Sequence, residues 1–124
     1  MTAHIPIVCL LILTLHMIWE DFKSVENVDE LSKTKKVLIF KHSTRCSISS
    51  TALNRFERNW KDNYSANIKL FYLDLIANRQ LSDLVAKHYE VEHESPQVLL
   101  ILDGKCIYNT SHLNINVNEL LNYV

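Results

Sequence analysis

One cysteine lies where chemistry would be expected, between a predicted strand and a predicted helix. Cys46 follows an apolar run that ends at Phe40, and it precedes a segment with helical periodicity. A helix N-terminus offers free backbone N–H groups and partial positive charge, which favour a thiolate. Arg45 adds a cation, and the flanking Thr44 and Ser47 are polar. The pattern predicts a reachable redox thiol, and a buried structural cysteine is the alternative.

A serine occupies the position of a second redox cysteine. Cys46-Ser47-Ile48-Ser49 reads C-x-x-S, so an internal disulfide cannot form within this motif. Ser49 follows one helical turn later and is a candidate donor toward the sulfur of Cys46, although it could equally be an ordinary first-turn serine. A lone thiolate favours mixed disulfides, because it attacks a disulfide, keeps one half and is released by a second thiol.

A proline precedes another apolar run about fifty residues later. Ser95-Pro96 introduces the run that starts at Gln97. A trans proline at a strand start is the common case. The functional alternative is a cis bond that faces the thiol and presents the backbone of Ser95 to a substrate. The pattern alone leaves both interpretations open.

The last two predicted strands form a hairpin. Asp103-Gly104 is a strong two-residue turn signal, and the resulting register pairs Ile101 with Cys106. Cys106 would then lie about 15 Å along the strand from Pro96, too far to resolve Cys46, since a disulfide needs Cα atoms within about 7 Å. The same register brings Ser111 and His112 back to the proline end, where they are candidates for lining the thiol site. The alternative is that they lie in a plain surface loop.

The elements that would position these residues can be read from hydrophobic periodicity. The predicted helices cover 25–33, 46–62, a segment capped by Asn78, and 117–123, and the predicted strands cover 37–40, 68–75, 97–102 and 105–109. The inner face of the helix after Asn78 is predicted to carry Leu81, Leu84, Val85 and His88. Two β-α-β units imply parallel strands with right-handed crossovers, and the hairpin adds antiparallel strands. The order β-α-β-α-β-β-α predicts a thioredoxin-like α/β fold with a four-stranded mixed sheet flanked by helices.

Composition restricts the class of protein. The chain has 124 residues, which suits one domain, and its net charge of −1 gives no broad electrostatic footprint for nucleic acid. Its three cysteines are too few and too scattered for a disulfide framework, and no pair has the spacing of metal ligands. Three reduced thiols fit a reducing compartment, so we expect a cytoplasmic protein.

The N-terminus is apolar and lacks charge. Residues 5–19 fall short of the roughly 20 apolar residues of a transmembrane helix, and no basic n-region or small-residue cleavage site marks a signal peptide. We interpret residues 1–16 as translated upstream sequence and residues 17–124, starting at Met17, as the domain. Cys9 then has no chemical role. A short membrane anchor through residues 5–19 is the alternative.

Two motifs together resemble a known family. The segments FKHSTRCSIS, residues 40–49, and HESPQ, residues 93–97, are similar to those of the YtxJ family, the monothiol bacilliredoxins. The resemblance runs from about Met17 to the C-terminus. The family motif is usually written T-C-P-I-S, so this chain departs from it by carrying Ser47 where proline is common and Arg45 before the cysteine. The reactive cysteine corresponds to Cys46 and the proline of the fold to Pro96.

The resemblance implies a monothiol thiol-disulfide oxidoreductase. Its expected reaction removes bacillithiol, a cysteine-containing glycoside thiol, or a similar low-molecular-weight thiol from S-thiolated client proteins, with bacillithiol as co-substrate and no bound cofactor or metal. It also implies a cis Ser95–Pro96 bond packed against Cys46. The competing function is a non-catalytic thioredoxin-fold module that binds thiols or acts as an adaptor. C-x-x-S proteins can also hold a metal cluster, which would colour the purified protein.

Overall fold

Residues 18–124 are described by a computed structural model, and they form five strands and four α-helices with short 3₁₀ turns. The predicted extension 1–16, the start at Met17 and Cys9 lie outside the described residues. The strands are β1 Glu20–Asp21, β2 Lys36–His42, β3 Ile68–Asp74, β4 Gln97–Leu102 and β5 Lys105–Ser111. The helices are α2 Val25–Leu31, α3 Ser47–Asn59, α4 Arg79–Tyr89 and α5 Val117–Leu120, and the 3₁₀ turns are η1 Asp62–Ala66, η2 His112–Asn114 and η3 Leu121–Tyr123.

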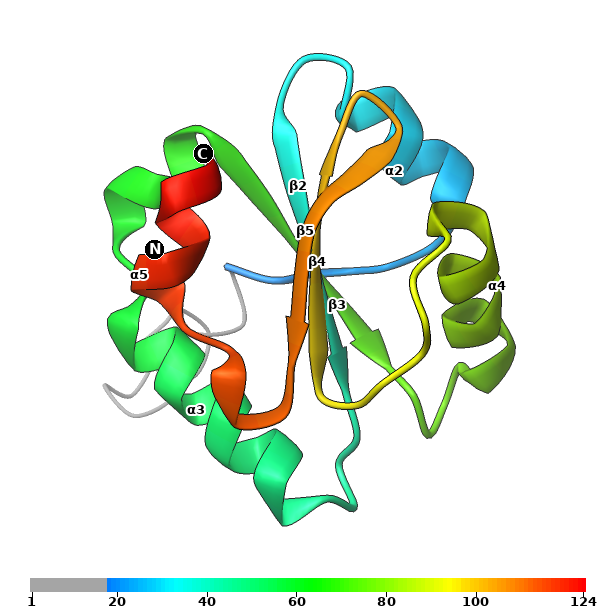
Figure 1. Cartoon of the computed structure of the whole chain (residues 1–124), viewed down its shortest axis with the longest axis vertical. Helices are drawn as coiled ribbons and strands as arrows, with labels where there is room; N and C mark the ends of the chain where they lie inside the picture. The colour runs from blue at the N-terminus through cyan, green and yellow to red at the C-terminus, as the bar shows by residue number, and fades with distance from the viewer. Residues whose placement is uncertain (1–17) are drawn as a thin grey trace, which may run out of the picture.

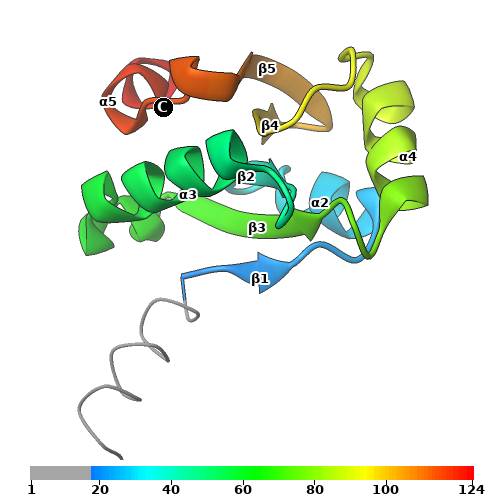
Figure 2. The same cartoon turned by 90° about the horizontal axis from the view of Figure 1, so that it is seen from below.

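The sheet lies between two helical layers (Figures 1 and 2). α3 and α5 cover one face, and α2 and α4 cover the other. Alternation along β2 supplies both cores, because Leu38 and Phe40 face α3 while Val37 and Ile39 face α2 and α4. All four side chains are fully buried, as expected for a central strand whose residues 37–40 form an unbroken apolar run.

The strand order β1-β3-β2-β4-β5 places the site-bearing loops at one end of the sheet. β2 and β3 run parallel and both end there, at His42 and Asp74. β4 runs antiparallel to β2 and begins at the same end, with Gln97 opposite Lys41. Figure 1 shows the loop into α3, the loop into β4 and the turn after β5 gathered at the lower end of the sheet.

The thioredoxin-like α/β fold is confirmed, with one strand more than predicted. β1 is only two residues long and adds a parallel edge beside β3, pairing Glu20 with Phe71. Both of its residues are exposed, so it has no apolar run that would identify it in the sequence. The hairpin is as predicted: Asp103 and Gly104 have φ of 55° and 76°, and Ile101 pairs with Cys106.

The predicted inner face of α4 is partly wrong. Its buried residues are Ser82, Val85 and Tyr89, whereas Leu84 is exposed. His88 lies at the surface, where its Nε2 is 2.7 Å from Asp29 Oδ2. Asn78 is the N-cap residue but makes no side-chain capping bond. Instead the carboxylate of Asp74 accepts from the N–H groups of the loop before it, at residues 76 and 77.

Candidate functional site

Cys46 is the N-cap residue of α3 and its side chain is partly exposed. A turn from Ser43 positions it, because the Cys46 N–H donates to Ser43 O at 3.1 Å. Its side chain makes no capping hydrogen bond to α3. The N–H groups of the first turn are therefore available to negative charge beside the sulfur, as the thiolate interpretation requires. Thr44, Arg45 and Ser47 are exposed around it.

Ser49 does not have the free hydroxyl expected of a donor to Cys46. It is fully buried, and its Oγ accepts from the Ser43 N–H at 3.0 Å and lies 2.6 Å from His42 Nδ1. The serine of the C-x-x-S motif thus joins the end of β2 to the loop that carries the cysteine. This hydroxyl stabilises the loop between strand and helix.

His42 lies beside the Cys46 loop, although it was not among the predicted site residues. It is the last residue of β2, and it faces α3 like Phe40 two positions before it. Burial lowers the pKa of His42 below its ordinary value, and the charge of Asp74 opposes that shift only in part. The neutral ring therefore dominates near pH 7, with Tyr72 5.7 Å away between ring centres. Strict alternation along β2 would have indicated this orientation.

The Ser95–Pro96 peptide bond is cis, which confirms that expectation. The Pro96 carbonyl accepts from the His112 N–H at 2.9 Å, so the turn after β5 is attached directly to the proline. Ser95 Oγ is buried and has no hydrogen-bond partner among the described residues. Lys41 pairs with Gln97 across the sheet, so Pro96 lies at the end of β2 from which the Cys46 loop departs. Direct packing of Pro96 on the sulfur stays a prediction.

Ser111 and His112 return to the proline end, as the hairpin register predicted. Ser111 pairs with Gln97, and its hydroxyl donates to Glu94 Oε2 at 2.9 Å. His112 adopts a left-handed φ of 56°, a conformation that is uncommon outside glycine and in which histidine is one of the more frequent residues. Glu94 was not among the predicted site residues. Its position two residues before Pro96 was the available signal.

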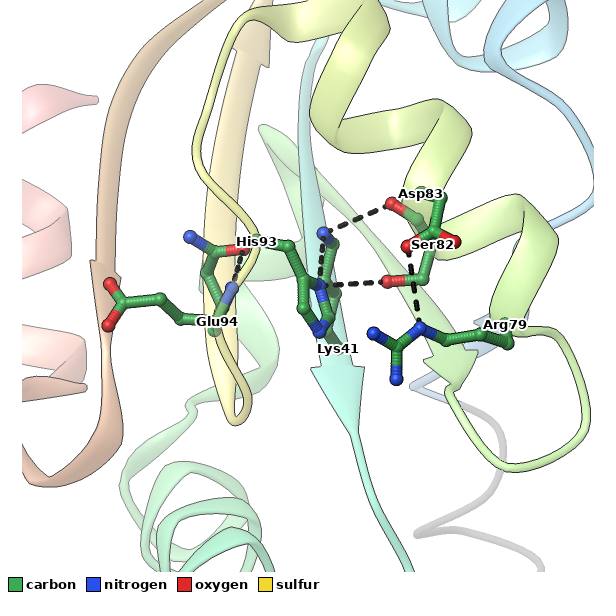
Figure 3. Close-up of polar contacts among 7 residues, drawn as sticks. Lys41, Arg79, Ser82, Asp83, His93 and Glu94 are labelled. Atoms are coloured by element: carbon green, nitrogen blue, oxygen red, sulfur yellow. Dashed lines mark hydrogen bonds and ion pairs between the residues drawn. The ribbon is translucent and has the colours of Figure 1, made fainter.

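A buried lysine supports the loop from the other face of the sheet (Figure 3). Lys41 is fully buried, and its Nζ lies 3.3 Å from both the Ser82 carbonyl oxygen and His93 Nδ1. Ser82 Oγ is a further 3.2 Å partner of His93 Nδ1. Desolvation lowers the pKa of Lys41 to about 8, and the charge of Asp83 offsets only part of this effect. The pKa of His93 is also lowered, first by burial and then by the charge of Lys41.

Cys106 lies on the part of β5 near the hairpin turn. It pairs with Ile101, and its Sγ donates to the Tyr108 carbonyl at 3.3 Å. Burial raises the pKa of the Cys106 thiol, which disfavours the nucleophilic thiolate. Its burial therefore argues against Cys106 as the reactive cysteine.

Neither a membrane-spanning helix nor a metal-binding cluster is found in residues 18–124. Within that range no helix is long and apolar enough to cross a membrane. No three His, Cys, Asp or Glu side chains of the same range are grouped so that they could hold a metal ion.

Comparison with known proteins identifies the family. The profile of the monothiol bacilliredoxin BrxC matches residues 19–120. This chain belongs to the monothiol bacilliredoxin family. The family resemblance inferred from the two motifs is thereby confirmed, and so is a role in thiol oxidoreduction.

Solved structures agree with this assignment. A protein described as a candidate oxidoreductase with a thioredoxin fold is 30% identical, with a TM-score of 0.71 over 87% of this chain and 95% of its own. Mitochondrial thioredoxin 3 from Saccharomyces cerevisiae is 17% identical, with a TM-score of 0.63 over 89% and 96%. The thioredoxin of Malassezia sympodialis is 14% identical, with a TM-score of 0.63 over 82% and 84%. The last two show the shared fold alone.

Proposed function

We propose that this protein removes bacillithiol, or a closely similar low-molecular-weight thiol, from S-thiolated proteins through a mixed disulfide on Cys46. The observation that carries the proposal is a partly exposed cysteine at the uncapped N-terminus of α3, with no second cysteine in the C-x-x-S motif. Membership of the monothiol bacilliredoxin family supports the choice of thiol.

The reaction needs two exchanges. In the first, the Cys46 thiolate attacks the bacillithiol sulfur of the client's mixed disulfide, an S–S bond forms to Cys46, and the client's own sulfur leaves as a thiolate that takes a proton from water. In the second, a thiolate from a free low-molecular-weight thiol or a reductase attacks the new disulfide and releases Cys46. Each step exchanges one S–S bond for another, so electrons balance, and the second thiol is left in a disulfide.

The hydrogen bonds of Ser49 support a reaction in which no residue of the C-x-x-S motif resolves the mixed disulfide on Cys46. Its hydroxyl is held between His42 and the Ser43 N–H, so the residue one turn after the cysteine contributes rigidity and no sulfur chemistry. The bound thiol therefore remains on Cys46 until an external thiol removes it. The free first-turn N–H groups of α3 stabilise negative charge on Cys46 whenever it is the leaving group.

The surroundings of the thiol suit a protein client. Three exposed apolar side chains come from three segments at this end of the sheet: Ile48 in the first turn of α3, Ile76 after β3 and Leu113 in η2. Exposed apolar side chains grouped around a reactive centre are a common feature of protein contact sites. We propose S-thiolated proteins of the reducing cytoplasm as clients and bacillithiol as co-substrate, with Thr44, Arg45, Ser95 and Pro96 near the bound thiol.

The proposal is tested by intact mass spectrometry after exposure to bacillithiol disulfide. The wild-type protein should gain one bacillithiol, and peptide mapping should place it on Cys46. Cys46→Ser should gain none, whereas Cys106→Ser should behave as the wild type. An adduct of undiminished yield on Cys46→Ser would rule out the assignment of Cys46.

A further inference from the structure

The loop before β4 sends two neighbouring side chains in opposite directions. Figure 3 shows His93 directed toward α4 and Lys41, whereas Glu94 extends to the other side, toward β5. Nδ1 of the His93 ring lies within hydrogen-bond distance of Lys41 Nζ and Ser82 Oγ. The Glu94 side chain instead contacts Ser111 and lies near His112, at the turn after β5.

Glu94 is held from both its backbone and its side chain. Its N–H donates to Gln97 Oε1 at 3.4 Å, and Gln97 is itself buried, with its Nε2 donating to the Glu92 carbonyl at 2.9 Å. The Ser111 hydroxyl donates to Glu94 Oε2 at 2.9 Å. A carboxylate fixed in this way loses little further conformational entropy when it binds a partner.

The second carboxylate oxygen of Glu94 remains available. Oε1 lies 3.8 Å from His112 Nδ1, beyond hydrogen-bond length, and the side chain is 45% exposed. Within residues 18–124 neither a lysine nor an arginine forms an ion pair with it. An ionised carboxylate has about four acceptor positions, and the single bond from Ser111 leaves most of them open.

This carboxylate belongs to the loop before β4, which lies at the end of the sheet from which the Cys46 loop departs. Glu94 immediately precedes Ser95, whose buried Oγ has no hydrogen-bond partner among the described residues. The next residue is the cis proline, whose carbonyl is bonded to His112. An unpartnered buried hydroxyl and an open carboxylate therefore flank the same turn, at the end of the sheet from which the Cys46 loop departs. Buried polar groups normally have partners, and the described residues supply none for Ser95 Oγ.

We propose that Glu94, held by Ser111, is a specificity residue that binds the ammonium group of an aminothiol attached to Cys46. A thiol built on cysteine with a free α-amino group carries that group on the carbon next to the one that bears the sulfur, so the positive charge stays close to the disulfide. This inference rests on the proposed function, because it concerns which small thiol the site accepts.

The test compares two disulfides that differ in this charge. Cystamine carries two ammonium groups, and N,N′-diacetylcystamine carries none. The rate of Cys46 thiolation by each is followed by intact mass, and the ratio of the two rates is the readout. The ratio should favour cystamine in the wild type. It should fall about tenfold in Glu94→Gln and stay at the wild-type value in Glu92→Gln, which removes the same charge from an exposed residue of the same loop.

Two results would overturn the subsite. The ratio could stay unchanged in Glu94→Gln, or it could fall equally in Glu92→Gln, which would indicate a general charge effect of the loop. Neither result depends on bacillithiol. If the ratio behaves as expected but bacillithiol is not removed from clients, the proposed function fails and the subsite stands. If bacillithiol is removed and the ratio ignores Glu94, the subsite fails alone.

Discussion

At the scale of single residues, the serine of the C-x-x-S motif acts through structure. Replacing Ser49 by alanine leaves the Ser43 N–H and the His42 ring without their partner in a buried place. We expect Ser49→Ala to lower the free energy of unfolding by about 1–3 kcal/mol, measured by urea denaturation. Thr51→Ala, which removes a hydroxyl from the exposed face of the same helix, should cost much less. Slower thiolation of Ser49→Ala with unchanged stability would instead indicate a direct bond to the Cys46 sulfur.

The buried amine of Lys41 should make stability depend on pH. Its pKa is lowered to about 8 in the folded protein, against 10.5 for the free group. Between these two pKa values the unfolded chain binds more protons than the folded protein. The free energy of unfolding therefore rises with pH across this window, by up to about 1.4 kcal/mol for each pH unit. Below pH 8 Lys41 is charged in both states, so the cost of burying its charge lowers the free energy of unfolding by its full amount.

A methionine at this position tests that sign. Lys41→Met keeps the approximate length of the side chain and removes the charge. We expect the variant to unfold at higher urea concentration than the wild type at pH 7.5, and the difference to shrink by pH 9.5. Comparison between the two proteins cancels the titration of the other groups. Parallel stability profiles over this range would mean that Lys41 is not the titrating group.

At the scale of elements, α3 holds the turn after β5 through one arginine. Arg55 Nη2 donates to the carbonyl oxygens of Leu113 at 2.8 Å and Ile115 at 2.7 Å. Hydrogen bonds from a charged donor contribute about 1.5–3 kcal/mol each when buried, and less here because the side chain is partly exposed. Arg55 thereby connects the helix that begins after Cys46 with the turn that carries His112.

Loss of this connection should loosen the turn. We expect Arg55→Met to lower the hydrogen-exchange protection of the His112 and Ile115 amides and to lower the free energy of unfolding by about 1–2 kcal/mol. Arg58→Met removes the same charge from an exposed position of α3 and should leave these amides protected. Equal protection in the Arg55 variant and the wild type would show that the backbone bond to Pro96 is enough to hold the turn.

The sequence predicted well where a local rule determines the structure. The Asp-Gly turn sets the pairing of Ile101 with Cys106, and a one-residue register shift between Leu100 and Ile101 then places Ser111 opposite Gln97, next to the proline. It predicted poorly where tertiary contacts decide. β1 exists because an exposed dipeptide pairs with β3. Ser49 is turned toward His42 because β2 continues to that residue, and a polar end of a strand carries no hydrophobic signal.

At the scale of the whole molecule, each face of the sheet supports a different loop near Cys46. The face covered by α3 and α5 carries His42 and Ser49 beneath the Cys46 loop. The face covered by α2 and α4 carries Lys41, which supports the loop before Pro96 through His93. Both faces meet at one end of the sheet, where parallel strands end and β4 begins. We propose that this end of the sheet accepts a small thiol from another protein.

Transfer of bacillithiol from a client protein tests that claim most directly. An S-bacillithiolated client is mixed with a small excess of the reduced protein, and both are followed by intact mass. We expect the client to lose one bacillithiol while the protein gains one, mapped to Cys46. Cys46→Ser should leave the client S-bacillithiolated, and Cys106→Ser should remove the bacillithiol as the wild type does. A client that keeps its bacillithiol in the presence of the wild type, or that loses it equally to Cys46→Ser, would contradict transfer through Cys46.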